Sequence, residues 1–179
     1  MKIGIISDTH GSIVDFKKAM EHLEDADKII HLGDVLNHGP RNPIPEGYDP
    51  AGLAELLAED DRFVFVKGNC DSEVDEMVTG KEINEREMII EVDPNVIYIS
   101  HGHRFSEEEM AKRAKENGAN IVLYGHTHKK VLKNIDQVMV VNPGSLSMPK
   151  DDCKSFAVFD GDLMKIYELE TGRLWTITE

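Results

Sequence analysis

Five short apolar runs of this chain each end in polar residues of the types that bind metal ions. The runs are typical of β-strands, because each contains about four aliphatic or aromatic residues bounded by polar or glycine-containing segments. They cover residues 3–6, 29–32, 63–66, 96–99 and 121–124. In open α/β sheets, ligands bind beyond the carboxyl ends of the strands. The pattern therefore predicts a site at one edge of a sheet.

The residues that follow these runs supply carboxylate, imidazole and amide groups. Glycine precedes three of them, where a strand must turn sharply with its backbone close to a neighbour. If the first strand continues, Asp8 and His10 point the same way. The same holds for His126 and His128 after the fifth strand. The candidate metal ligands are Asp8, His10, Asp34, Asn69, His101, His126 and His128.

Seven ligands are too many for one ion that must keep an open position. They suit two divalent ions bridged by one carboxylate, an arrangement typical of sites in which metal-bound hydroxide attacks phosphorus and displaces the leaving group. Mixed oxygen and nitrogen donors fit Mn²⁺, Fe²⁺ or Zn²⁺. A closed structural zinc site would need closely spaced cysteines, and the chain has only Cys70 and Cys153.

The remaining pattern alternates strands with amphipathic segments. We expect helices at 12–24, 50–59, 71–78 and 106–117. We expect hairpins at 87–100, 129–141 and 155–169, and an edge strand at 173–178. Residues 35–49 hold three prolines and two glycines and predict a long irregular loop. A βαβ-like first half and a hairpin-rich second half predict a mixed sheet, or two stacked sheets, with helices outside. The length of 179 residues predicts one domain, residues 1–179.

The charge of the chain limits its partners. It has 20 Lys and Arg against 34 Asp and Glu, a net charge of −14. Such an acid excess argues against binding duplex nucleic acid or an anionic membrane, but not against a phosphate held by a metal. The sequence shows no export signal and no apolar run long enough to span a bilayer. With only two cysteines, we expect a cytoplasmic protein.

The motifs, taken together and in order, resemble those of the calcineurin-like metallophosphoesterase superfamily. They are Asp8-Thr9-His10, Gly33-Asp34, Gly68-Asn69, His101 and Gly125-His126-Thr127-His128. Segments 36–43 and 68–71 resemble the bacterial YfcE-type phosphodiesterase branch. The resemblance covers nearly the whole chain. It implies an α/β fold, a four-layer αββα sandwich of two mixed β-sheets flanked by helices.

The resemblance also implies the metal assignment and the reaction. One ion takes Asp8, His10 and His128, the second takes Asn69, His101 and His126, and Asp34 bridges them. Mn²⁺ is the expected metal, with Zn²⁺, Fe²⁺, Ni²⁺ and Mg²⁺ as alternatives. The implied reaction is hydrolysis of small phosphodiesters, and the resemblance is compatible with a homo-oligomer.

One position departs from the wider superfamily. Where histidine often follows the asparagine, this chain has Cys70, whose thiol, with a pKa of about 8.5, is a weaker charge partner than an imidazolium. We expect Asp71 to orient Cys70, and His103 to touch phosphate or orient a ligand. Arg41 and His38 are candidate substrate-binding residues of the proline-rich loop. The alternative is that this loop is solvent-exposed or a subunit contact.

Two other functions use the same fold. A scaffold subunit of the retromer coat has this architecture, and loss of ligand residues would favour that reading. Here all seven remain. A phosphomonoesterase or nuclease could use the same site, although the acidic surface disfavours long nucleic acids as substrates.

Overall fold

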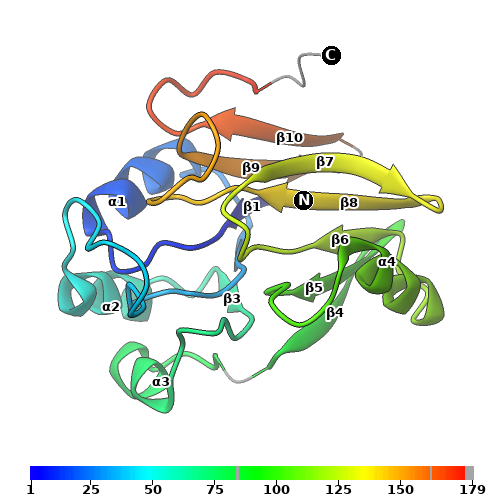
Figure 1. Ribbon diagram of the computed structural model, residues 1–179. Coiled ribbons are helices and arrows are strands. Elements are labelled where there is room, and N and C mark those ends of the chain that lie inside the picture. The colour runs from blue at the N-terminus through cyan, green and yellow to red at the C-terminus, as the bar shows by residue number, and fades with distance from the viewer. Residues whose placement is uncertain (84, 162, 176–179) are drawn as a thin grey trace.

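Ten strands form two five-stranded sheets in the computed structural model, which describes residues 1–83, 85–161 and 163–175 (Figure 1). The first sheet has the order β10 (Leu163–Glu168), β9 (Ser155–Asp160), β1 (Lys2–Ile6), β2 (Lys28–His31), β3 (Phe63–Phe65). The second has the order β4 (Glu87–Val92), β5 (Asn95–Ser100), β6 (Ile121–Leu123), β8 (Val138–Pro143), β7 (Lys130–Ile135).

Each sheet has a parallel centre and antiparallel edges. In the first sheet β1, β2 and β3 run parallel, while β9 pairs antiparallel with both β1 and β10. In the second, β5, β6 and β8 run parallel, while β4 and β7 are antiparallel edge strands. Because parallel strands end at the same edge, the loops after β1, β2 and β3 lie together, as do those after β5 and β6.

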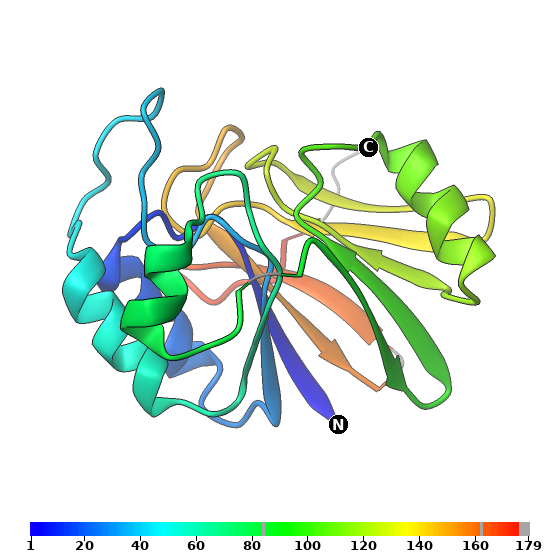
Figure 2. The ribbon, with the colours of Figure 1, turned by 90° about the horizontal axis from the view of Figure 1, so that it is seen from below.

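Four helices cover the outer faces of the sheets in the described part of the chain. They are α1 (Ile13–His22), α2 (Pro50–Glu59), α3 (Glu73–Thr79) and α4 (Glu107–Glu116). Figure 2 shows the first three at one side of the molecule and α4 at the opposite side, with the strands between them. The expected helices are thus present, with their capping residues Ser12, Asp49, Ser72 and Ser106 just outside them.

Three apolar clusters separate the four layers. Phe16 and Leu53 belong to the cluster between the first sheet and helices α1 and α2. Ile5 and Ile99 belong to the cluster between the two sheets, and Met110 and Val122 to the one between the second sheet and α4. The strands β1, β2 and β6 are nearly all buried because they have a layer on each face. The predicted αββα sandwich of two mixed sheets is confirmed.

The end of the chain differs from the prediction. Within residues 173–175 the only strand pairing is one bridge from Leu174 to Tyr167. The rest of the expected edge strand, residues 176–178, lies outside the described residues. The loop 35–49 is irregular as predicted, with a single bridge from Tyr48 to Ser12.

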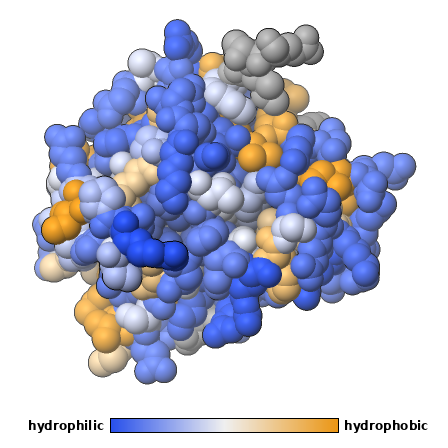
Figure 3. Space-filling model, in the orientation of Figure 1, coloured by the Kyte–Doolittle hydropathy of each residue, from blue (hydrophilic) through white to orange (hydrophobic). Residues whose placement is uncertain are grey.

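The surface is mostly hydrophilic on the face shown in Figure 3, and α3 carries an exception. Its side chains Val74, Met77 and Val78 are exposed. None of the helices in the described residues is both long and apolar enough to cross a membrane.

Candidate metal centre

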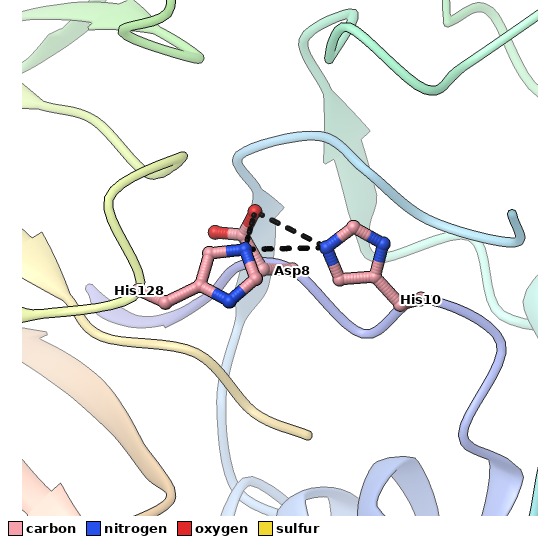
Figure 4. A group of neighbouring side chains, drawn as sticks. All are labelled: Asp8, His10 and His128. Carbon is pink, nitrogen blue, oxygen red and sulfur yellow. Dashed lines mark hydrogen bonds and ion pairs between the residues drawn. The ribbon is translucent and has the colours of Figure 1, made fainter. Parts of the chain in front are cut away.

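The seven side chains singled out by the sequence lie together where the carboxyl ends of the parallel strands of both sheets meet. One group contains Asp8, His10 and His128 (Figure 4). The Nε2 atoms of His10 and His128 are 3.3 Å apart, and His128 Nε2 is 3.2 Å from Asp8 Oδ1. Two atoms that each bind one ion at about 2.1 Å lie at most about 4.2 Å apart. The three atoms are therefore close enough to share a single ion.

A second group contains Asp34, His101 and His126, with Asn69 beside it. Asp34 Oδ2 is 3.4 Å from His101 Nε2 and 3.7 Å from His10 Nε2. Asn69 Oδ1 is 3.2 Å from His101 Nε2. Asp34 Oδ2 thus lies within 3.7 Å of a donor atom in each group. A carboxylate that bridges two metal ions requires this position.

Backbone carbonyls orient three of the imidazoles. His10 Nδ1 donates to Asn37 O at 2.8 Å, and His101 Nδ1 donates to Leu32 O at 2.6 Å. His128 Nδ1 donates to Met148 O at 2.6 Å. A neutral imidazole carries one proton, which here lies on Nδ1, so in its neutral form each of these rings presents a bare Nε2 to the centre of the site. Metal-binding histidines are fixed in this way by a partner on the other ring nitrogen.

One oxygen of the Asp8 carboxylate is hydrogen-bonded to the protein, and the other is available to bind a metal ion. Its Oδ2 accepts hydrogen bonds from Ser7 Oγ at 2.6 Å and from the His126 amide at 3.0 Å. Its Oδ1 is buried and has no hydrogen-bond partner among the described residues. A buried, unpaired carboxylate oxygen is costly unless a cation is bound there. The donor set therefore fits a divalent metal ion.

The pKa shifts of Asp8 and His101 also fit a metal site. Burial disfavours the Asp8 carboxylate, but the neighbouring imidazoles of His10, His128 and His101 outweigh it and hold the pKa of Asp8 well below its usual value. Burial likewise disfavours an imidazolium at His101, yet Asp34 and Asp8 raise the pKa of His101 to about 9. Protons thus balance the carboxylates in the metal-free protein, and a metal ion would displace them on binding.

The backbone corrects one sequence expectation. Strand β1 ends at Ile6, and Asp8 and His10 have φ of 54° and 45°. His126 and His128, at 66° and 57°, lie beyond the end of β6 in the same left-handed conformation. The idea that strand alternation aligns these pairs is wrong, because left-handed turns present them instead. Such conformations are rare outside glycine and cluster at functional sites.

The predicted role of the glycines before the ligands is visible at Gly33. Its φ is 97°, and a Cβ there would lie 2.6 Å from the Gly68 amide nitrogen. Only glycine lets the loops after β2 and β3 approach this closely.

An open cavity of about 730 Å³ lies over the two groups. Asp34, Asn69, His126 and His128 line it, and so do Arg41 and Cys70. His38 is not among its lining residues. The His38 ring packs edge-on against Tyr48, and its Nδ1 is buried without a hydrogen-bond partner in the described part of the chain.

Cys70 and Asp71 are adjacent in the chain but have different hydrogen-bond partners. The Cys70 amide donates to Asp34 Oδ1 at 2.8 Å, and Asn69 Nδ2 donates to Cys70 Sγ at 3.3 Å. Burial, reinforced by the charge of Asp34, raises the pKa of the Cys70 thiol to about 12. The Asp71 carboxylate instead accepts hydrogen bonds from the amides of Asp34, Val35 and Gly68, at 2.7–2.8 Å. No hydrogen bond joins Asp71 to the Cys70 thiol among the residues the structure describes, and Asp71 fixes the loops rather than that thiol.

His103 lies next to the second group. Its ring centroid is 5.4 Å from that of His101 and 5.9 Å from that of His126. Burial and the neighbouring His101 lower the pKa of His103 to about 4. The side chain is therefore neutral and within reach of a ligand bound at the second group.

Other residues support the site beside the candidate metal ligands. Lys150 lines the main cavity, and its amide donates to His128 O. Ser145 and Ser147 both donate from Oγ to Asp8 O, at 2.9 and 3.0 Å. Both serines follow the end of β8, so the segment after this strand packs beneath Asp8.

The fold and this cluster of ligands define a metallophosphoesterase, and the comparisons agree. The sequence model of the calcineurin-like phosphoesterase superfamily domain matches residues 1–163, so the chain belongs to this superfamily. It is 37% identical over 173 residues to Phosphodiesterase YfcE of Escherichia coli (strain K12), covering 94% of this chain and 92% of that protein. It is 34% identical over 152 residues to Phosphodiesterase MJ0936 of Methanocaldococcus jannaschii, covering 80% and 83%.

Comparison with solved structures finds the same fold. The structure of the E. coli phosphoesterase Yfce matches with a TM-score of 0.90 at 34% identity, covering 98% of this chain and 97% of that one. Vacuolar Protein Sorting 29 from Cryptosporidium parvum matches with a TM-score of 0.70 at 18% identity, covering 97% and 94%. This protein is a distant neighbour that shares the fold.

Proposed function

We propose that this protein hydrolyses small phosphodiesters at a centre of two divalent metal ions. The observation that carries the proposal is the position of Asp34 Oδ2, 3.4 Å from His101 Nε2 and 3.7 Å from His10 Nε2. It lies between two groups of buried donor atoms, beside an open cavity. The superfamily and the two relatives named phosphodiesterases support the same reaction.

The metal ligands are proposed as two sets that share Asp34. One set is Asp8, His10 and His128, and the other is Asn69, His101 and His126. We propose Mn²⁺ as the metal, with Zn²⁺, Fe²⁺, Ni²⁺ and Mg²⁺ as alternatives, because the donors are imidazole, carboxylate and amide oxygen. When bound, such ions polarise the phosphoryl oxygens and lower the pKa of water.

The other residues bind and orient the substrate. Arg41 reaches the cavity from the proline-rich loop, and its guanidinium matches a phosphate geometrically. His38 supports this loop from its contact with Tyr48. Asp71 fixes the backbone on both sides of Asp34. We propose that His103 contacts the substrate phosphate, and that Cys70 is at most a weak proton donor to the leaving group.

The partners, the location and the oligomeric state of the protein are also part of the proposal. A net charge of −14 supports small phosphodiesters, rather than duplex nucleic acid or a membrane, as partners. Two free cysteines are compatible with a cytoplasmic location. A homo-oligomer remains part of the proposal.

The test is a comparison of matched esters. Protein reconstituted with Mn²⁺ is assayed on bis(p-nitrophenyl) phosphate and on p-nitrophenyl phosphate, and its metal content is measured in the same samples. We expect the diester to be cleaved with the higher kcat/KM, and chelation to abolish cleavage. A preference for the monoester would contradict the proposal in favour of a phosphomonoesterase. Full metal content without any hydrolysis would favour the scaffold alternative.

A further inference from the structure

A second, smaller cleft of about 290 Å³ adjoins the candidate metal centre. Asn69 lines both this cleft and the main cavity. His103 also lines the smaller cleft, and its ring is 5.4 Å from the His101 ring and 5.9 Å from the His126 ring. A molecule bound over the metal centre can therefore extend into this cleft past Asn69 and His103.

Three cationic side chains from different segments line the cleft: Lys67 follows β3, Arg86 precedes β4 and Arg104 follows β5. Two backbone contacts bring these segments together. The Lys67 amide donates to Glu85 O at 2.7 Å, and Glu87 pairs with Ser100 at the end of the β4–β5 ladder. The cationic lining is thus a product of the tertiary fold.

These three cations have no carboxylate partner within the described residues, although the chain carries 34 acidic residues. Elsewhere Lys2, Lys18, Arg62, Lys81, Lys130 and Lys154 all form ion pairs. Among the residues that the structure describes, Asp71 is the one acidic side chain that lines the cleft. Its oxygens accept three backbone N–H groups. The cleft therefore keeps a net positive charge in a protein whose overall charge is −14.

We propose that this cleft binds a second phosphate group of the substrate, so that the preferred substrates are phosphodiesters with a further phosphate on one ester arm. The choice of substrate rests on the proposed function, whereas the anion site rests on the cleft alone. Two guanidinium groups and an ammonium offer the paired N–H donors that a phosphate dianion accepts. The cleft is small and polar, which fits one phosphate better than a base or an apolar group.

The direct test measures binding. Calorimetry on the Mn²⁺-loaded protein compares thymidine 3′,5′-bisphosphate with thymidine 5′-monophosphate, which differ only in the second phosphate. We expect the bisphosphate to bind about tenfold more tightly, since charge-assisted hydrogen bonds to phosphate are strong. In Arg86→Gln and in Arg104→Gln, two exposed positions, we expect the ratio of affinities to fall to about two, the statistical value for a ligand with two phosphates.

Lys115→Gln is the matched control. It removes the same charge from an exposed position of α4 that does not line the cleft, and the tenfold ratio should remain. A ratio near two in the parent protein would overturn the proposal. So would a tenfold ratio that survives both arginine variants, or one that Lys115→Gln removes equally.

A kinetic experiment tests the choice of substrate separately from the proposed function. Thymidine 5′-(p-nitrophenyl phosphate) and its 3′-phosphorylated form release the same p-nitrophenolate. We expect a KM about tenfold lower for the phosphorylated ester, and equal KM values in Arg86→Gln. If neither ester is cleaved, the proposed function fails, while the calorimetric ratio still decides whether the cleft binds phosphate. Equal KM values in an active parent protein would overturn the substrate choice.

Discussion

His10 Nε2 and His128 Nε2 lie 3.3 Å apart, and the Nδ1 atom of each ring is bound to a backbone carbonyl. The two residues are 118 positions apart in the chain. Each is aimed by a loop from a different part of the fold, through Asn37 O and Met148 O respectively. Two Nε2 lone pairs held this close repel each other unless a proton or a metal ion lies between them, and the first prediction concerns the metal ion.

The His128→Gln variant should hold one divalent ion per chain where the parent protein holds two. Only Asp8, His10 and the shared Asp34 remain for the first ion, which should then be lost on dialysis, whereas the ligands of the second ion are intact. Elemental analysis of dialysed protein measures this. His22→Gln is the control and should keep both ions. His22 is the last residue of α1, and its ring bonds to Leu169 O. Two ions retained in His128→Gln would contradict the assignment.

The carboxylates Asp34 and Asp8 should behave differently from each other. Asp34→Asn should lose both ions and at least about a thousandfold in kcat/KM, because its Oδ2 serves both groups and metal polarisation supplies several kcal/mol. Asp8→Asn removes the same charge but should weaken mainly the first ion. Metal titration followed by calorimetry distinguishes the two variants. An Asp34→Asn variant with one tight site would place the bridge elsewhere.

The Cys70 thiol should contribute little to leaving-group departure. Its pKa is raised to about 12 by burial and by Asp34, so it is a poor proton donor. The rate should then fall steeply as the leaving-group pKa rises, with aryl diesters fast and alkyl diesters slow. Cys70→Ser should change the aryl rates less than about threefold and leave the metal content constant. A plot of log rate against leaving-group pKa that is flat in the parent and steep in Cys70→Ser would reverse this conclusion.

His31 should make the protein less stable in acid. The ring is fully buried, and it accepts from the Gly33 amide and bonds through Nε2 to Thr9 Oγ1. Burial lowers its pKa to about 3, while an unfolded histidine has a pKa near 6.5. Between these values the unfolded state binds the extra proton, so stability falls as the pH falls, by up to about 1.4 kcal/mol per pH unit.

Urea unfolding of metal-free protein at pH 7 and pH 5 measures the effect. His31→Gln leaves polar groups unpaired and should cost about 1–3 kcal/mol at pH 7. It should lose less stability than the parent on acidification, because the buried titrating group is gone. Parallel losses in parent and variant would show that His31 does not titrate in this range.

The sequence singled out the candidate ligands that the structure brings together, because the pattern that marks them is local. Gly125-His126-Thr127-His128 and Asp8-Thr9-His10 lie directly after apolar runs, and parallel strands bring their ends together. The αββα layers were expected mainly from the resemblance, since periodicity alone left one mixed sheet or two stacked sheets open. The alternation argument for Asp8 and His10 failed because φ angles in turns depend on contacts that a sequence pattern does not contain.

Residues that act through long-range contacts were not predictable in this way. Lys150 had no motif, and it reaches the cavity because its backbone is tied to His128. His38 and Arg41 share one loop, yet only Arg41 lines the cavity. Which side of an irregular loop faces the site is decided by packing, here the contact of His38 with Tyr48.

The kinds of chemical group, their order at the strand ends and the acidic charge of the chain all follow from the sequence. The tertiary structure alone decided that the Nε2 atoms converge, that Asp34 Oδ2 lies between two groups, and that Lys67, Arg86 and Arg104 meet beside Asn69. The physical reason is the range of the interactions. Strand periodicity and turn chemistry act over a few residues, whereas the position of a side chain depends on distant partners, such as Ser147 Oγ and Asp8 O, 139 positions apart.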